Sequence, residues 1–129
     1  MVLYKIGRGL LSIKAKNNVK RGNVYVVNLK GADPDFRGFF PVLILQNDEE
    51  NKHCDFTFGV PIHISEKKGD SYIPVSAKGL HTSSKIFCNK LICFRRKRIK
   101  RFLFTLDHKR MKCVEKFFIK HAGLHGLPQ

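Results

Sequence analysis

The sequence predicts a mainly β protein with one C-terminal helix, an α+β fold in the form of a small barrel. Two observations carry this prediction. Short runs rich in β-branched and aromatic residues follow one another along most of the chain, separated by clusters of Gly, Pro, Asn and Asp. Near the end, an aspartate precedes apolar residues at helical spacing. Several short strands and one helix can bury a shared core as a small barrel with the helix packed on it.

The first three strands are expected in the first half of the chain. Residues 23–29 have the β-branched and aromatic content of a strand. Residues 39–46 form a nearly continuous apolar run, which predicts a central strand buried on both faces. The polar residues 47–52 predict a turn. Residues 54–64 predict the third strand, whose end Pro61 should place at a sheet edge or a bulge.

Two polar stretches predict loops, and three later segments predict strands. Residues 31–38 hold Gly, Asp and Pro in close succession, which is typical of a loop. Residues 66–71 are polar and predict the loop of a hairpin. The later strands are expected at residues 72–75, 85–94 and 99–106.

A helix is expected after the last strand. Asp107 offers a side-chain oxygen that can cap its first turn. The helix should run to about Ala122, because Gly123 is a natural stop. Its predicted apolar stripe, at spacings of three and four, consists of Met111, Val114, Phe117, Phe118 and His121.

Length and charge narrow the class of protein. A chain of 129 residues is expected to form one domain, and its net charge of +15 predicts an anionic partner such as nucleic acid, an anionic membrane or an acidic protein. No apolar run approaches the ~18 residues of a membrane-spanning helix. Residues 3–13 are interrupted by charged residues and glycines, so no secretory signal is expected and the cytoplasm is the predicted location.

The cysteines and histidines predict no metal site and no cofactor. Cys54, Cys88, Cys93 and Cys113 include no C-x-x-C pair, so zinc or thioredoxin-like chemistry is not expected. We expect four reduced thiols packed as small hydrophobic side chains, with structural disulfides as the alternative for a secreted chain. Cys88 and Cys93 lie on one predicted strand at an odd spacing and should face opposite sides of it.

Two segments resemble the MazF/PemK family of toxin endoribonucleases. Residues 20–29 are K-R-G-N-V-Y-V-V-N-L and residues 40–48 are F-P-V-L-I-L-Q-N-D, where the family has K-R-G-D-V-Y-x-x-D-L and R-P-V-L-V-I-Q-N-D. The resemblance implies an SH3-like β-barrel of the CcdB/MazF/PemK type with a C-terminal helix, which forms homodimers. It extends over residues 20–124, leaving residues 1–19 as an N-terminal extension and residues 125–129 as a short tail.

The positive charge is concentrated in the second half of the chain. Residues 85–121 hold thirteen Lys or Arg against two acids, a net charge of +11. One interpretation is a solvated loop whose charges keep an edge strand from pairing with other chains. The other, which we favour, is a nucleic-acid-binding patch that contacts phosphates. Its densest part consists of Arg95, Arg96, Lys97, Arg98, Lys100 and Arg101.

Base contacts are expected from aromatic residues near the start of the second strand. Phosphate contacts set affinity but carry no base information, so an RNA-cleaving enzyme needs other contacts as well. Single-stranded RNA is usually held by stacking of its bases on aromatic side chains. Phe39 and Phe40, together with Phe36, are the candidates, with core packing as the alternative for at least one of them.

Cleavage of RNA without a metal needs a base for the 2′-OH, an acid for the leaving oxygen and donors for the charged phosphorane. The resemblance places a family Thr on His63 and a loop acid near Asp35. Two family Arg positions hold Phe40 and Ile92 instead. Arg37, in the loop before Phe40, can supply the cation, because a guanidinium grips phosphate with a fork of donors. His63 would then transfer protons, since its reference pKa is about 6.5.

The resemblance therefore implies a toxin-type endoribonuclease that cleaves single-stranded mRNA and is neutralised by an antitoxin carrying an acidic segment. The alternative is a toxin-fold protein with an impaired active site that binds RNA, DNA or an antitoxin without cleaving. Each predicted catalytic residue also has a structural interpretation. His63 can be a surface or hydrogen-bonded structural residue, Arg37 a solvated loop cation, and Asp35 a turn residue after a proline.

Overall fold

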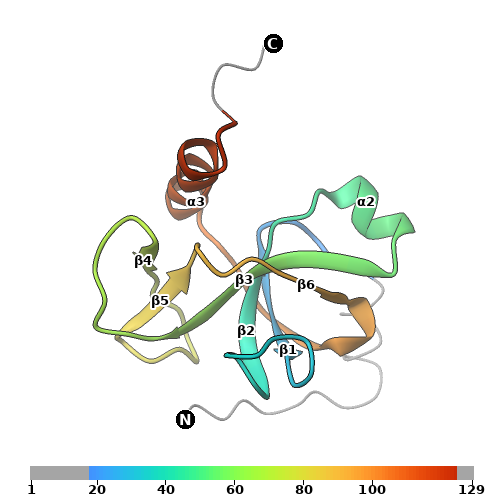
Figure 1. The fold of residues 1–129 in the computed structure, drawn as a ribbon. Helices are drawn as coiled ribbons and strands as arrows, with labels where there is room; N and C mark the ends of the chain where they lie inside the picture. Colours follow the sequence, from blue (N-terminus) through green and yellow to red (C-terminus); the bar gives the residue numbers. More distant parts are fainter. Residues whose placement is uncertain (1–17, 125–129) are drawn as a thin grey trace.

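The computed structural model describes residues 18–124, which form a bent antiparallel sheet with a long helix on one side (Figure 1). The predicted extension up to residue 17 and the predicted tail 125–129 lie outside the described residues. The helices are α2 (Asp48–His53) and α3 (His108–His121), with a short 3-10 helix, η1 (Arg96–Arg98). The strands are β1 (Asn23–Asn28), β2 (Phe39–Ile44), β3 (Phe56–Ile64), β4 (Tyr72–Pro74), β5 (Ser84–Phe87), β6 (Ile92–Arg95) and β7 (Ile99–Thr105).

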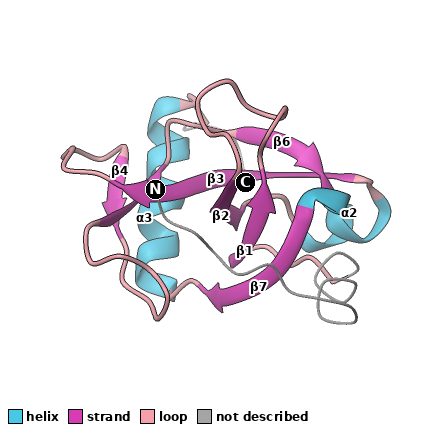
Figure 2. Cartoon of the chain, turned by 90° about the horizontal axis from the view of Figure 1, so that it is seen from below, coloured by secondary structure: helices cyan, strands magenta, loops and turns pink. Residues whose placement is uncertain are grey.

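Strand β3 is the centre of the sheet. One edge of β3 pairs with β2, while its other edge pairs with β6 along the first half and with β5 along the second half. The sheet continues from β2 to β1 and β7, and from β5 to β4. It curves so that η1 joins β6 directly to β7 (Figure 2). Within residues 18–124 no ladder pairs β6 with β7, so the predicted barrel is a bent sheet that is not fully closed.

The sheet has one apolar core on each face. Neighbouring residues of a strand point to opposite faces, so Val24 and Leu43 face α3, whereas Tyr25 and Val42 face away from it. We call these the outer face and the inner face. The outer core also contains Val60, Ile62, Ile86, Val114 and Phe117. The inner core also contains Val27, Leu29, Phe36, Ile44, Ile92, Phe94 and Ile99.

Pro61 lies within the sheet, at a point where one edge of β3 has no partner, so the predicted edge is confirmed at this residue on one side only. On one side it pairs with Val42 of β2. On the other side it falls between the part of β3 paired with β6 and the part paired with β5. No strand on that side needs the N–H that proline lacks. Gly59 allows β2 to approach closely, because a Cβ there would collide with the backbone carbonyl of Leu43.

The segment predicted as a turn at residues 47–52 is helix α2 instead. Asn47 caps the helix by accepting a hydrogen bond from the N–H of Glu50 at 2.8 Å. Acidic residues fill the first turn and basic residues the last, which suits the helix dipole. These features escape a search for apolar periodicity, because only Asn51 of this helix is buried.

The single strand predicted at residues 85–94 is two strands. The chain turns after β5, where the N–H of Lys90 donates to the carbonyl of Phe87 at 3.1 Å, and β6 then continues along the same edge of β3. Cys88 and Cys93 therefore do not share a strand, contrary to the prediction. Strand β3 thus pairs with β6 over residues 56–59 and with β5 over residues 62–64.

All four cysteines are free thiols, as predicted. Only Cys88 is buried, and burial raises its pKa to about 12. Cys54 is partly buried. Cys93 and Cys113 are exposed, so the prediction that all four pack as small hydrophobic side chains is wrong for these two. Within residues 18–124, no helix is long and apolar enough to cross a membrane.

Helix α3 begins and ends as the sequence predicts. The Asp107 side chain accepts a hydrogen bond from the N–H of Arg110 at 3.1 Å and caps the first turn. Gly123, just after the helix, has a positive φ of 69°. The predicted stripe packs on the outer core, where Met111, Val114 and Phe117 are buried.

Candidate active site and nucleic-acid interface

The loop between β1 and β2, which carries Asp35 and Arg37, is fixed at its start by an arginine from η1. One terminal nitrogen of Arg98, Nη1, donates to the carbonyl oxygens of Asn28 at 3.1 Å and Lys30 at 2.7 Å. Both acceptors are backbone groups where β1 ends and the loop begins. Bonds from a charged donor are stronger than neutral ones, so this guanidinium holds the loop against the β6–β7 connection.

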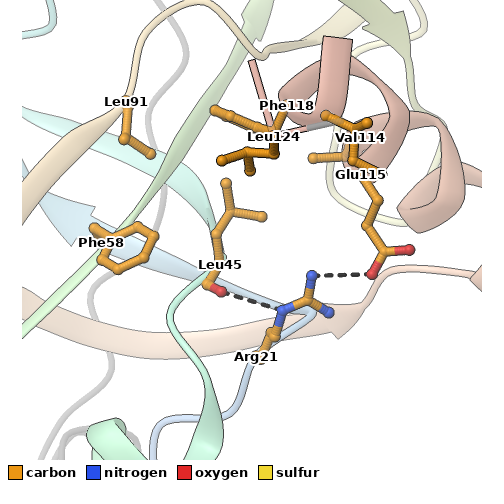
Figure 3. A pocket seen from close by; sticks show the side chains of 9 residues that line it. Arg21, Leu45, Phe58, Leu91, Val114, Glu115, Phe118 and Leu124 are labelled. Atoms are coloured by element: carbon orange, nitrogen blue, oxygen red, sulfur yellow. Dashed lines mark hydrogen bonds and ion pairs between the residues drawn. The ribbon is translucent and has the colours of Figure 1, made fainter. Parts of the chain in front are cut away.

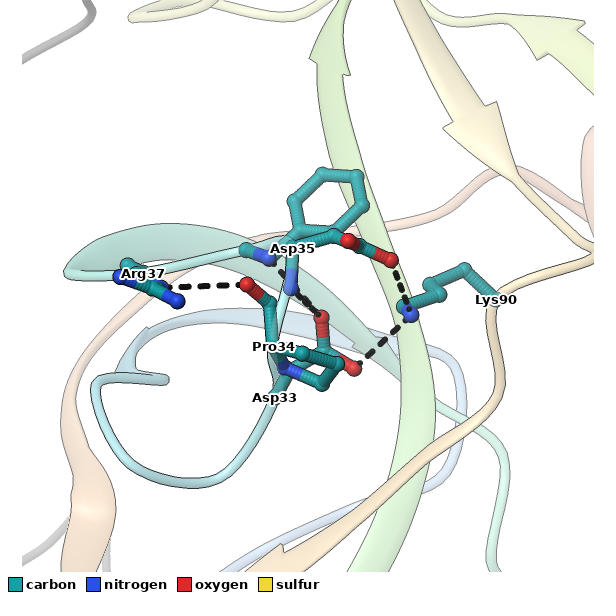
Figure 4. Close-up of polar contacts among 6 residues, drawn as sticks. Asp33, Pro34, Asp35, Arg37 and Lys90 are labelled. Atoms are coloured by element: carbon teal, nitrogen blue, oxygen red, sulfur yellow. Dashed lines mark hydrogen bonds and ion pairs between the residues drawn. The ribbon is translucent and has the colours of Figure 1, made fainter.

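The tip of the same loop is held by Lys90. Its Nζ lies 3.1 Å from a carboxylate oxygen of Asp33 and 2.8 Å from one of Asp35 (Figure 4). The other oxygen of Asp33 accepts hydrogen bonds from the N–H groups of Asp35 and Phe36 at 2.9 and 2.8 Å. Burial raises the pKa of Asp33, but these backbone bonds and Lys90 outweigh it and hold the pKa below its usual value.

Arg37 points to the other side of the loop from Lys90 (Figure 4). Its Nε donates to the carbonyl of Pro34 at 3.1 Å, and the side chain is exposed. Asp35 is paired with Lys90 and not with Arg37. The terminal nitrogens of the Arg37 guanidinium form no hydrogen bond within residues 18–124, so they are available to a phosphate.

His63 lies near the end of β3, next to this loop. Its ring centroid is 5.2 Å from that of Phe40 and 6.1 Å from that of Phe36, both edge to face. Phe36 lies between Asp35 and Arg37 in the sequence, so His63 touches the loop that carries both. Partial burial lowers the pKa of His63, because it disfavours the charged ring. No hydrogen bond joins any two of the three predicted catalytic residues in the described part of the chain.

The two positions where the family carries Arg are part of the inner core. Phe40 is half-buried, with its ring centroid 5.2 Å from that of Phe36 and 5.2 Å from that of His63. Ile92 is buried on β6. Neither side chain can donate to a phosphate, so neither supplies the cation that the resemblance assigns to these two positions. Phe39 lies on the opposite face of β2 from Phe40, because the two are neighbours on one strand.

Two aromatic residues that the sequence analysis missed extend this cluster. The ring of Phe87 lies 5.5 Å from that of Phe36, and the ring of Tyr72 lies 5.2 Å from that of Phe87. They come from β5 and β4, which pair with each other and follow β3 in the sheet. Lys85 and Phe87 are two positions apart on β5. A prediction of β5 as a separate short strand would therefore have placed Lys85 and Phe87 on the same face.

The predicted cationic run lies around the β6–β7 connection, and several of its side chains are already bonded within the chain. Arg95 lies over the ring of Phe56 at 4.6 Å. Arg96 donates from Nη1 to the carbonyl of Asn51 in α2 at 2.8 Å. Arg98 holds the start of the loop, as described above. Of the remaining cations, Lys97 is exposed, whereas Lys100 and Arg101 are half-buried on β7.

Arg95, the first residue of this run, and His63 lie at opposite ends of β3. Arg95 pairs with Phe56, the first residue of β3, and His63 lies seven residues further on, about 23 Å away at the usual rise of a strand. They also lie on opposite faces. The neighbouring pair Thr57 and Phe94 is buried in the sheet, while Phe56 and Arg95 are exposed on its outer face. The structure therefore separates Arg95 from His63, whereas Arg98 of the same run lies against the start of the loop that carries Asp35 and Arg37.

The outer face carries an apolar hollow of about 400 Å³ between α3 and the sheet (Figure 3). Arg21 crosses its edge, donating to the carbonyl of Leu45 at 3.1 Å and pairing with Glu115 of α3 at 3.0 Å. Leu91, Ile119 and Leu124 are exposed around it, by 54%, 47% and 49%. Its other lining residues are Phe58, Val114 and Phe118.

No group of three or more His, Cys, Asp or Glu side chains in residues 18–124 is arranged to hold a metal ion. The ionisable groups around the loop are its carboxylates, Lys90, Arg37 and His63. Among them are a partly buried histidine whose pKa lies below its ordinary value and an exposed arginine.

Solved structures define the class of fold. The chain superposes on an endoribonuclease from a mycobacterial species with a TM-score of 0.69 at 17% identity, covering 87% of this chain and 97% of that one. An endoribonuclease in complex with its cognate antitoxin, also mycobacterial, gives 0.68 at 17% identity over 84% and 98%. MazF from Deinococcus radiodurans gives 0.68 at 17% identity over 81% and 96%. The predicted α+β fold of the MazF type is confirmed.

The sequence itself defines the family. Residues 20–121 match the family model of PemK-like, MazF-like toxins of type II toxin–antitoxin systems. The chain therefore belongs to this family, and the resemblance seen in its first two strands is confirmed. No curated protein sequence matches the chain at a significant level.

Proposed function

We propose that this toxin-family protein cleaves single-stranded mRNA, with His63 as the proton-transfer group and Arg37 as the cation that stabilises the charged phosphorane. The observation that carries the proposal is the contact of His63 with Phe36, which places a partly buried histidine beside the loop that bears Arg37. Membership of the toxin family supports the same reaction class.

The proposed reaction is an in-line attack of a ribose 2′-oxygen on its neighbouring phosphorus. The bond from the 2′-oxygen to phosphorus forms as the bond from phosphorus to the 5′-oxygen breaks, giving a 2′,3′-cyclic phosphate and a 5′-hydroxyl. Neutral His63 takes the 2′-OH proton, and a water molecule on the opposite side of the phosphorus protonates the departing 5′-oxygen. The free nitrogens of Arg37 donate to the phosphoryl oxygens, whose charge increases in the transition state.

Asp35 supports this site through the loop rather than by touching the substrate. Its carboxylate is bound to Lys90, so it fixes the loop tip from which Arg37 projects in the other direction (Figure 4). A fixed cation costs less to organise in the transition state than a mobile one.

Two protein partners are indicated, an antitoxin by the net positive charge and a second copy of the chain by the apolar hollow on the outer face. We infer that an antitoxin with an acidic segment binds this strongly basic protein, and that the toxin acts in the cytoplasm, where mRNA is translated. We also infer a homodimer, supported by the exposed leucines and isoleucine around the apolar hollow. Light scattering of the purified protein should give twice the chain mass of 14.9 kDa, and Leu91→Glu should give the mass of one chain.

A second candidate function is RNA or antitoxin binding without cleavage. It is favoured by the two apolar residues at family Arg positions, Phe40 and Ile92, and by the absence of any bond that joins Arg37 to His63 in residues 18–124. A long single-stranded RNA incubated with the protein in EDTA distinguishes the two functions.

Discrete fragments with 5′-hydroxyl ends are the expected result of that experiment. His63→Gln and Arg37→Gln should each lower the rate by about 10²–10³, whereas His53→Gln, an exposed histidine on α2, should leave it unchanged. Intact RNA that shifts on a native gel would instead establish the binding function. Cleavage that survives both substitutions would mean that other residues do the chemistry.

A further inference from the structure

We propose that Tyr72 and Phe87 form a base-stacking surface that holds an unpaired nucleobase of single-stranded RNA next to His63. This inference rests on the proposed action on RNA and adds the residues that would contact a base. It concerns the β4–β5 end of the sheet, to which neither the family match nor the catalytic proposal assigns a role.

The rings form a continuous row across the sheet. From Phe40 the row passes to His63 and to Phe36, each at ring-centroid distances between 5.2 and 6.1 Å. From Phe36 it passes to Phe87 at 5.5 Å and then to Tyr72 at 5.2 Å. Successive rings meet edge to face, at interplanar angles of 77° to 84°. Aromatic groups prefer such edge-to-face or offset-stacked contacts, so a further aromatic ring such as a base can join the row.

The strand register puts the row on the inner face. Residues that are directly opposite in an antiparallel pair lie on the same side of the sheet. His63 is opposite Lys85, and Tyr72 is opposite Phe87. Lys85 and Phe87 are two apart on β5, so all four share one face. Their neighbour Ile86 belongs to the outer core instead.

The rings of the row differ in how much of their surface is exposed to solvent. Phe36 is buried and packs into the inner core, so it supports the other rings. Tyr72, Phe87, Phe40 and His63 are all half-buried. Rings that served only as core would be covered, whereas here four neighbouring rings keep part of their surface in water. Every base has a flat π-face and can stack on such a surface without a specific hydrogen-bond pattern.

Lysines border the row where phosphates of a stacked strand would run. The ammonium of Lys67 lies 5.5 Å from the centre of the Tyr72 ring. Lys85 stands beside His63, and its Nζ donates to the carbonyl of Lys67 at 2.8 Å. The combination of exposed rings and flanking cations is the usual composition of a surface that binds single-stranded nucleic acid.

The test uses 2′-O-methyl oligonucleotides, which cannot be cleaved through a 2′-hydroxyl, each with one abasic position. For wild-type protein, one position of the scan should weaken binding by about 5- to 140-fold, the range known for stacking of one base. Phe87→Leu and Tyr72→Leu should bind the intact strand more weakly by a factor in the same range. For these two variants, the abasic position should cause no further loss of affinity, which we call loss of the abasic penalty. Tyr72→Phe keeps the aromatic ring, so it should retain the wild-type affinity for the intact strand and the abasic penalty. Circular dichroism and urea unfolding of each variant exclude a folding defect.

A full abasic penalty in Phe87→Leu, or no penalty at any position with wild-type protein, would overturn the stacking surface. The failure of this inference is distinguishable from failure of the proposed function. If wild-type protein cleaves RNA and Phe87→Leu keeps its rate, cut pattern and affinity, the cleavage stands and the stacking is wrong. If wild-type protein shows the abasic penalty and never cuts ordinary RNA, the stacking stands and the cleavage is wrong.

Discussion

The two ends of strand β3 carry positive charge in different ways. At its first residue, the arginine-rich connection of β6 and β7 has the highest density of charge, but Arg96 and Arg98 donate to backbone carbonyls and Arg95 covers an aromatic ring. Near its last residue, fewer cations surround a partly buried histidine and a row of half-exposed rings. At the first end two arginines are bonded to backbone carbonyls, whereas the second end also presents partly exposed rings that a ligand can use.

This difference shows why charge density in the sequence does not locate a site. An arginine whose donors are bonded to carbonyl oxygens contributes to folding, since its hydrogen bonds are made whether or not a ligand is present. An exposed cation beside a titratable base and a stacking surface contributes to recognition and chemistry. The predictions below separate these two roles, beginning with the largest expected effect.

Arg98→Met should destabilise the fold by about 1.5–3 kcal/mol, because it removes the charged donor that two backbone carbonyls share. Urea unfolding measures the change. The matched control is Lys97→Met, the exposed neighbour, which should stay within about 0.5 kcal/mol of wild type. Equal stabilities of the two variants would show that the arginine-rich end is not a structural clamp.

Lys90→Met should slow RNA cleavage by about ten- to a hundredfold through misplacement of the loop that carries Arg37. Lys90→Arg should restore part of the rate, since it can still pair with both carboxylates. Lys90→Met should also let the pKa of Asp33 rise toward its ordinary value, because the cation that lowers this pKa is lost. Nuclear magnetic resonance can follow the titration. An unchanged rate with a displaced Asp33 pKa would mean that the loop tip has no part in catalysis.

The pH dependence of cleavage should have an acid limb below about pH 6.5, the ordinary value for histidine. Burial lowers the pKa of His63, so the neutral base persists until the pH falls through that lowered value, and the rate then falls tenfold per pH unit. His63→Gln should remove this limb from the residual activity. If His63→Gln retains the acid limb, the limb arises from the titration of a group other than His63.

The same shift predicts a change in stability. The unfolded chain protonates His63 at its ordinary pKa, before the folded chain does, so the free energy of unfolding should decrease as the pH falls from about 6.5 to the lowered value. Urea unfolding between pH 8 and 5 should show a smaller decrease for His63→Gln. His53→Gln serves as the control for an exposed histidine.

Lys97→Gln should have the smallest effect. If this exposed cation contacts one phosphate, the slope of log affinity against log salt should fall by about 0.7 for single-stranded RNA. The pattern of cut sites should not change, because a phosphate contact carries no base information. A changed pattern would place Lys97 near the bases and weaken the distinction between the two ends of β3.

Much of the fold was predictable because its signals are local. The apolar run of β2, the Asp107 cap and the stripe of α3 each lie within a few residues, and the motif around β1 and β2 identified the family. Helix α2 was missed because its evidence is a cap and charges rather than an apolar stripe.

The organisation of the site was less predictable, because its contacts join distant residues. Lys90 and Asp35 are 55 positions apart, and Arg98 and Asn28 are 70 apart. No local pattern shows that one arginine of a basic run will turn inward to a backbone carbonyl while its neighbour remains exposed. The row of rings draws on four strands and one loop, so it becomes visible only when β4, β5, β3 and β2 are placed side by side.

The most direct measurement is photo-crosslinking of the His63→Gln variant to single-stranded RNA carrying 4-thiouridine, with the attached residues mapped by mass spectrometry. At limiting RNA, cross-links should concentrate on Phe40, Tyr72 and Phe87 around the position of His63. Cross-links confined to Phe56 and residues 95–101, with none at the β4–β5 end, would place RNA on the arginine-rich end of the sheet and contradict the separation of roles.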